Sequence, residues 1–152
     1  MWGATSCNRL DVLHCINGNL TAEEYKDIMD FVLIPYAHEG PFPDGLYLFQ
    51  HDFSLVHTAK RVKQLLFQCG VQLLKWLSKG ADLNIIEHLW ARLKKRLRKI
   101  SLNSASPDAL RNAVATEWKC LKEDKAFVGA LYLSMPSCIE AVTAIEGGMT
   151  RH

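Results

Sequence analysis

The chain has 152 residues, of which 49% are hydrophobic, and its formal net charge is +2 at pH 7. This length and apolar fraction suit one domain with a core of its own and exclude an intrinsically disordered chain. The near balance of charge excludes bulk electrostatic attraction to nucleic acid, so such binding would have to come from a local cluster of basic residues.

The first half of the chain predicts alternating strands and helices. Two short apolar segments, 2–6 and 10–16, are bounded by polar residues and Gly, which is typical of strands and permits a hairpin. Residues Thr21 to Glu24 have the spacing of a capping box, so a helix is expected after Thr21. Because a residue that precedes proline disfavours the helical conformation, we expect this helix to end before Pro35.

Residues 46–76 show the order strand, helix, strand. The run 46–50 is apolar nearly throughout, as a strand covered on both faces would be. A helix is expected to open at residues 57–59 and to stop at Gly70, and residues 71–76 predict a second strand. Because this order is typical of a parallel crossover, we predict an α/β fold.

The second half predicts helices. An apolar stripe over residues 86–100 indicates an amphipathic helix, and further helices are expected from Ser106 to Leu121 and over about 134–145. Basic residues fill much of the remaining surface of the first of these helices: Arg92, Lys94, Lys95, Arg96, Arg98 and Lys99. Three interpretations of this basic helix stay open, namely a contact with the DNA backbone, a nuclear import signal over 94–99, and the solvated face of an amphipathic helix.

No feature of the sequence predicts export or membrane insertion. The five cysteines are odd in number and lack the CxxC spacing of zinc and redox sites. No run approaches the roughly 20 apolar residues of a membrane span, and the first residues lack the pattern of a signal peptide. We therefore expect a nuclear or cytoplasmic protein that makes no membrane contact.

One carboxylate follows the end of a predicted strand, and a second lies at the start of a predicted helix. Asp52 follows the buried strand, Glu87 lies in the first turn of the basic helix, and thirty-four residues separate them. Ordinary roles are available to both, a loop cap for Asp52 and a favourable helix-dipole contact for Glu87. A shared metal site is the alternative, because ligands of open α/β sheets bind at the carboxyl ends of the strands.

Two segments of the chain resemble mariner-type DDE transposases, the cut-and-paste DNA transposases of the Tc/mariner superfamily. Residues 49–59, FQHDFSLVHTA, resemble the FQQDNAPCHTA segment of that family, and residues 76–90, WLSKGADLNIIEHLW, resemble its WPAQSPDLNPIEHLW segment. The spacing between the second and third catalytic acids is also the family's own. The resemblance extends over essentially the whole chain.

The resemblance implies an RNase H-like fold of the DDE integrase and transposase type and a role in DNA transposition and integration. In that family three carboxylates hold two divalent ions, usually Mg²⁺, which activate the attack on a phosphodiester. Asp52 would be the second acid and Glu87 the third, both as catalytic residues and metal ligands. His57 and Asn84 would lie beside this site, and DNA of the transposon ends would be the partner.

The first acid of the family has no counterpart in residues 1–152. In the family it lies on a central strand upstream of the segment that residues 2–4 resemble, and Met1 stands directly before that segment. We therefore expect a partial catalytic domain over 1–152, without the family's N-terminal helix-turn-helix, without its first central strand and without catalytic activity.

The missing strand would leave a sheet edge open. Either the N-terminal hairpin pairs directly with the 46–50 strand, or a second copy or a partner protein covers the edge. The alternatives to a DNA-associated function are therefore a protein-interaction module and a transposon relic without function.

Overall fold

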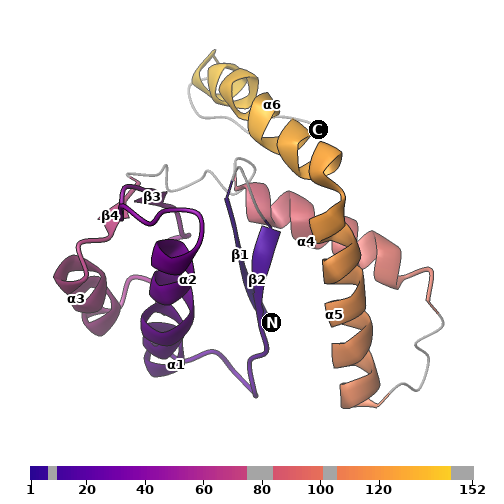
Figure 1. Ribbon diagram of the computed structural model, residues 1–152, viewed down its shortest axis with the longest axis horizontal. Helices are drawn as coiled ribbons and strands as arrows, with labels where there is room; N and C mark the ends of the chain where they lie inside the picture. Colours follow the sequence, from indigo (N-terminus) through magenta and orange to yellow (C-terminus); the bar gives the residue numbers. More distant parts are fainter. Residues whose placement is uncertain (7–9, 75–83, 101–105, 145–152) are drawn as a thin grey trace. The chain divides into compact units, whose positions relative to one another are not determined.

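The computed structural model describes residues 1–6, 10–74, 84–100 and 106–144, and it confirms a mixed α/β protein (Figure 1). The chain divides into two compact units, one made of Met1–Trp2 with His14–Ser78 and the other of Gly3–Leu13 with Lys79–His152. Among the helices of the described ranges, none combines the length and the apolar character needed to cross a membrane. Each unit buries apolar side chains of its own.

The first unit opens with helix α1, Ala22–Ile28, which begins as the capping box predicts. The amide of Glu24 donates to Thr21 Oγ1 at 3.2 Å, and the amide of Thr21 donates to Glu24 Oε2 at 3.0 Å. Both bonds satisfy donors that a helix start would otherwise leave without partners. The buried face of α1 carries Tyr25 and Ile28.

The expectation that this helix ends before Pro35 is wrong. A π-helical segment, η1 at Met29–Leu33, continues α1, and helix α2 then runs over Ile34–Glu39. At the junction the amide of Ile34 donates to the carbonyl of Met29, five residues earlier. Pro35 thus falls in the first turn of α2, directly after the π-helical segment.

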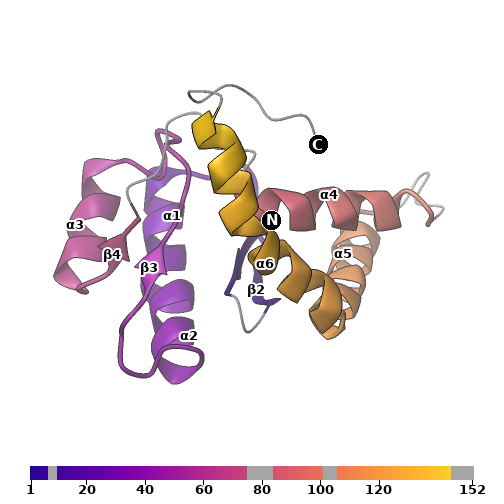
Figure 2. The ribbon, with the colours of Figure 1, turned by 90° about the horizontal axis from the view of Figure 1, so that it is seen from above.

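The parallel crossover is confirmed. Strand β3, Leu48–Phe49, pairs in parallel with strand β4, Gln72–Leu73, with Leu48 opposite Gln72 and Phe49 opposite Leu73. Helix α3, Lys60–Gln68, connects them and packs against α1 (Figure 2). Gly70 follows α3 with φ +68°, a conformation that favours glycine at a helix end.

Strands β3 and β4 are shorter than predicted. The prediction that β3 is buried on both faces of the sheet is wrong. Leu46 is 72% exposed and Leu48 is 62% exposed. The strands described here form two separate two-stranded sheets, β1–β2 and β3–β4, so the first of the two alternatives, pairing of the hairpin with the 46–50 strand, is wrong for the described residues. Because the β3–β4 sheet has only two strands in the part of the chain that the structure describes, no second layer of structure covers Leu46 and Leu48. Residues 75–76 of the predicted second strand lie outside the described ranges.

In the second unit, strands β1, Trp2–Thr5, and β2, Leu10–His14, pair as the N-terminal segments predict. Most of β1 and β2 belongs to this unit. A Cβ added to Gly3 would lie 2.9 Å from Trp118 Cη2, closer than side-chain carbons approach. Glycine at this position therefore lets β1 pack directly on the indole ring.

Three helices complete the second unit: α4, Ile85–Leu97, α5, Pro107–Glu123, and α6, Lys125–Ala144. Ser106 caps α5, because the amide of Ala109 donates to Ser106 Oγ at 3.2 Å. Their shared core consists of Ile85, Leu89, Leu93, Val114, Trp118, Leu121 and Val128. The predicted starts of α4 and α5 are thus confirmed.

Helix α6 begins at Lys125 rather than near Ser134. Asp124 caps this earlier start, since the amide of Phe127 donates to Asp124 Oδ1 at 3.1 Å. Val128 is 5% exposed in the shared core, and Phe127 packs against it. The added first half of α6 is therefore held by tertiary packing. The predicted end of this helix, at about residue 145, lies outside the described ranges.

Candidate functional site

Asp52 lies in the loop between β3 and α3. Its Oδ1 accepts a hydrogen bond from the amide of Ser54 at 2.9 Å and lies 2.5 Å from His57 Nδ1. The carbonyl of Ser54 in turn accepts from the Thr58 amide at 3.0 Å and from Thr58 Oγ1 at 2.9 Å. Asp52 therefore acts as a cap of its own loop and holds His57 beside it.

The Asp52 side chain keeps its charge at neutral pH. Partial burial raises the pKa of its carboxyl, but the Ser54 hydrogen bond and the neighbouring His57 outweigh that effect, so the pKa lies below its ordinary value. The side chain is also 62% exposed. An ionised, accessible carboxylate has the properties that a Mg²⁺ ligand requires.

An aromatic stack fixes this loop against α1. The Tyr25 ring lies on the His57 ring with centroids 4.0 Å apart, and the His51 and His57 rings are stacked at 5.5 Å and 6°. The Tyr25 hydroxyl lies 3.1 Å from His51 Nδ1. Tyr25 is fully buried, and this burial raises the pKa of its hydroxyl. The stack thus gives the Asp52 loop a fixed place on the first unit.

Burial also determines the charge of His51. Burial and, to a smaller extent, the nearby His57 lower the pKa of the imidazole to about 4, while Asp52 opposes the shift. His51 is therefore neutral at pH 7. A neutral ring can share a hydrogen bond with the Tyr25 hydroxyl as either donor or acceptor, according to its tautomer.

The third-acid candidate, Glu87, is exposed in the first turn of α4. Its amide donates to the carbonyl of Asn84 at 2.9 Å, and Asn84 occupies the N-cap position. Asp52 and Glu87 belong to different units, so their shared site stays a prediction. Among the described residues no group of three or more His, Cys, Asp or Glu side chains is placed to hold a metal ion.

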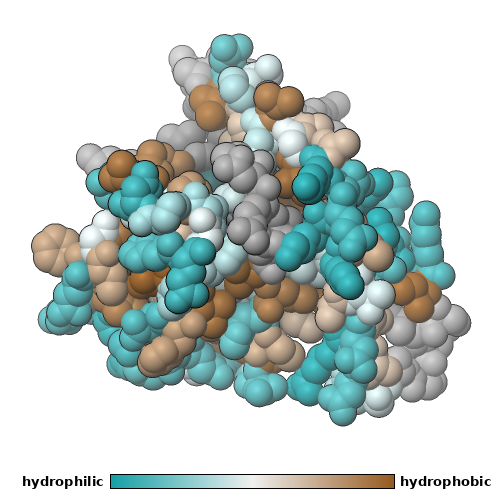
Figure 3. Space-filling model, viewed as in Figure 1, coloured by the Kyte–Doolittle hydropathy of each residue, from teal (hydrophilic) through white to brown (hydrophobic). Residues whose placement is uncertain are grey.

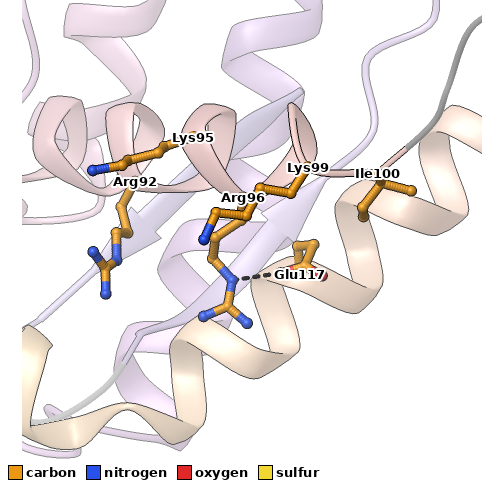
Figure 4. Close-up of a pocket in the computed structure, with 6 residues that line it drawn as sticks. All are labelled: Arg92, Lys95, Arg96, Lys99, Ile100 and Glu117. Atoms are coloured by element: carbon orange, nitrogen blue, oxygen red, sulfur yellow. Dashed lines mark hydrogen bonds and ion pairs between the residues drawn. The ribbon is translucent and has the colours of Figure 1, made fainter.

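The basic residues of α4 separate into two sets. Arg92, Lys95, Arg96 and Lys99 recur at helical spacing and line one pocket of about 290 Å³, together with Ile100 and Glu117 (Figure 4). Lys94 and Arg98 are not among the lining residues. Figure 3 shows hydrophilic residues gathered on the surface in the region of α4 and α5. The helix thus presents a cationic face next to α5.

Two contacts orient the arginines of this pocket. Arg96 Nε lies 2.5 Å from Glu117 Oε2, and this hydrogen bond raises the pKa of Arg96. The guanidinium carbon of Arg92 lies 5.2 Å from the centroid of the Phe127 ring, a cation–π contact. Figure 4 shows both guanidinium groups extending from α4 on its α5 side.

Comparison with known proteins shows which proteins the chain is similar to. It is 30% identical over 152 residues to the Tc1 transposase of Caenorhabditis elegans and 30% identical over 152 residues to the Tcb1 transposase of Caenorhabditis briggsae. Each alignment covers 100% of this chain and 54% of the relative. Over its full length the chain is thus related to the Tc1/mariner transposases. The family resemblance of residues 49–59 and 76–90 is thereby confirmed.

The transposase-related chain spans about half the length of the curated relatives it matches. The Tcb2 transposase of Caenorhabditis briggsae is 27% identical over 154 residues, again with 100% of this chain and 54% of the relative covered. No protein-family model matches the chain.

Several residues that shape the two sites of the transposase-related chain escaped sequence reasoning. The sequence places Tyr25 on an apolar helix face but does not indicate its contact with His51, which lies 26 residues further along the chain. Glu117 is one of several acids on α5, and its contact with Arg96 spans 21 residues. Only the role of Asp52 as a loop cap was indicated locally, because the backbone groups that it contacts follow it directly in the sequence.

Proposed function

We propose that this transposon-derived protein associates with DNA through the pocket face of α4. The observation that carries the proposal is the gathering of Arg92, Lys95, Arg96 and Lys99 around one pocket that holds a single carboxylate. Its relatives are transposases of transposable elements, which supports DNA as the partner. Phosphate oxygens accept hydrogen bonds from guanidinium and ammonium groups and are held by their charge.

DNA affinity is expected to fall steeply with salt. Neutralising three to four phosphates releases counterions and gives a slope of log affinity against log salt of about −2.7 to −3.6. Replacing Lys95 with glutamine is expected to reduce this slope by about 0.9. Fluorescence anisotropy of a labelled duplex between 50 and 200 mM salt measures both values.

Lys94→Gln provides the matched control for this measurement. It changes the net charge equally on the same helix, but Lys94 does not line the pocket. We expect a smaller effect than for Lys95→Gln. A flat salt response of the unmodified protein would rule out DNA binding by this face.

The same proposal extends to the fold and the two acids. The parallel β3–α3–β4 crossover, with Asp52 after β3 and Glu87 at the start of α4, supports an RNase H-like arrangement of the DDE type. Asp52 suits a Mg²⁺ ligand by its charge and exposure, and Glu87 suits one by its exposure. The described residues alone do not supply a group of three such ligands, so no metal-dependent step is derived from them.

Residues 1–152 are expected not to cleave DNA in the presence of Mg²⁺. The resemblance assigns two of the family's three acids to this chain, and the loss of one metal ligand lowers the rate about a thousandfold or more. Nicking of supercoiled plasmid by the unmodified chain should therefore equal nicking by Asp52→Ala. Turnover that Asp52→Ala abolishes would show instead that the site is active.

A protein-interaction function is the second candidate. Leu46 and Leu48 at β3 are largely exposed, and Leu55 in the Asp52 loop is 90% exposed. Such residues favour contact with a second copy or another protein at the edge of the sheet. Oligomerisation that rises with concentration, without salt-dependent DNA binding, would support this function.

For the DNA-associated function we propose a nuclear location, since residues 94–99 also suit an import signal.

A further inference from the structure

We infer that Glu117 is an internal counter-ion that a phosphate must displace from Arg96, so that this carboxylate limits how tightly the α4 pocket binds a phosphodiester. The inference rests on the proposed DNA-binding function of the same pocket. It assigns Glu117 a role in setting affinity, in addition to the cationic residues that contact the ligand.

The geometry distinguishes Arg96 from the other three cations. Arg96 Nε lies 2.5 Å from Glu117 Oε2, and the side chains are 32% and 17% exposed. Among the described residues no carboxylate lies within ion-pair distance of Lys95 or Lys99, and Arg92 instead contacts the Phe127 ring. The pocket therefore contains three cations open to an anion and one already held by a carboxylate.

Carboxylate and phosphate oxygens compete for the same donors. Both groups accept hydrogen bonds from the planar N–H edges of a guanidinium, and both are drawn by its charge. The Nε–H of Arg96 cannot serve Glu117 and a phosphate at full strength together. A phosphate that enters the pocket must also approach the negative charge of Glu117. The carboxylate thus opposes binding both by occupying a donor and by repulsion.

The Arg96–Glu117 pair is partly buried, with side chains 32% and 17% exposed, and glutamine keeps the size and the hydrogen-bonding oxygen of the Glu117 side chain. Replacing Glu117 with glutamine should therefore preserve the fold while it frees the charge of Arg96. For this variant we expect about fivefold tighter binding of a duplex of about 20 base pairs at low salt. The salt slope should steepen by about 0.9, because the pocket then carries one more net positive charge against the phosphates.

Two further variants isolate the pair. The double variant Arg96→Gln/Glu117→Gln removes both charges together, so its affinity and salt slope should return to those of the unmodified protein within about twofold. Glu123→Gln makes the same change in net charge on α5 at an exposed residue outside the pocket. It should leave the salt slope nearly unchanged.

The outcomes separate the inference from the function on which it rests. Equal effects of Glu117→Gln and Glu123→Gln, or weaker binding by Glu117→Gln, would overturn the counter-ion role while DNA binding by the pocket stands. A flat salt response of the unmodified protein would overturn the proposed function itself.

A measurement on the unmodified protein covers the case in which Glu117→Gln does not fold. Nuclear magnetic resonance of the Arg96 Nε–H and the Glu117 carboxyl carbon should show both signals shifting as the duplex is added. Saturation with DNA without a change in the Glu117 signal would contradict displacement.

Discussion

Replacement of Trp118 by alanine is expected to lower the free energy of unfolding by about 3–5 kcal/mol. Trp118 is 3% exposed in the core of the second unit, and its ring lies 4.9 Å from that of Trp90 between centroids. Gly3 of β1 also packs on the Trp118 indole, with no space for a side chain between the strand and the ring. Truncation would therefore leave a cavity bounded by a strand and a second large ring, which cannot easily collapse.

Urea unfolding followed by circular dichroism measures this loss. Since a domain of this size has a total stability of about 5–15 kcal/mol, the variant should unfold at clearly lower denaturant concentration. Leu110→Ala, on the same helix but 46% exposed, is the matched control and should change stability by no more than about 0.5 kcal/mol. A loss below about 1 kcal/mol for Trp118→Ala would contradict the central place of this ring in the core.

The protein is also expected to lose about 3 kcal/mol of stability between pH 7.5 and pH 4 through His51 alone. Burial lowers the pKa of this imidazole from 6.5 to about 4, so the folded state binds fewer protons than the unfolded state in that interval. The contribution of His51 is fully present above the unfolded pKa and is lost as the pH falls through the folded pKa. Stability should therefore decrease on acidification.

His51→Asn tests the source of this pH dependence, because asparagine keeps a hydrogen-bond acceptor for the Tyr25 hydroxyl but does not titrate in this range. Urea unfolding of this variant should show a loss smaller by about 3 kcal/mol over the same interval. The lowered pKa of Asp52 acts in the same direction at lower pH, so measurements end at pH 4. His38→Asn changes an exposed histidine of the same unit and should retain the pH dependence. An imidazole midpoint near 6.5 for His51, read by nuclear magnetic resonance, would contradict the prediction.

Features set by neighbouring residues were predictable from the sequence. The capping box at Thr21 and the Ser106-Pro107 start of α5 are local, because their hydrogen bonds join residues three apart. The β3–α3–β4 crossover followed from the change of apolar period along the chain. The resemblance to transposases followed from residues 49–59 and 76–90, and the cationic face of α4 from helical spacing. In each case the information lay within one element or one short segment.

Tertiary contact decided the remainder. Helix α6 extends back to Lys125 because Val128 and its neighbours pack on the core of the second unit, which local propensity does not show. Likewise, the Tyr25–His51 contact and the Arg96–Glu117 pair join residues 26 and 21 positions apart. The sequence by itself determined which acids, histidines and cations this protein carries. Folding decided which of them have partners, because burial and opposite charge act between elements that only the tertiary structure brings together.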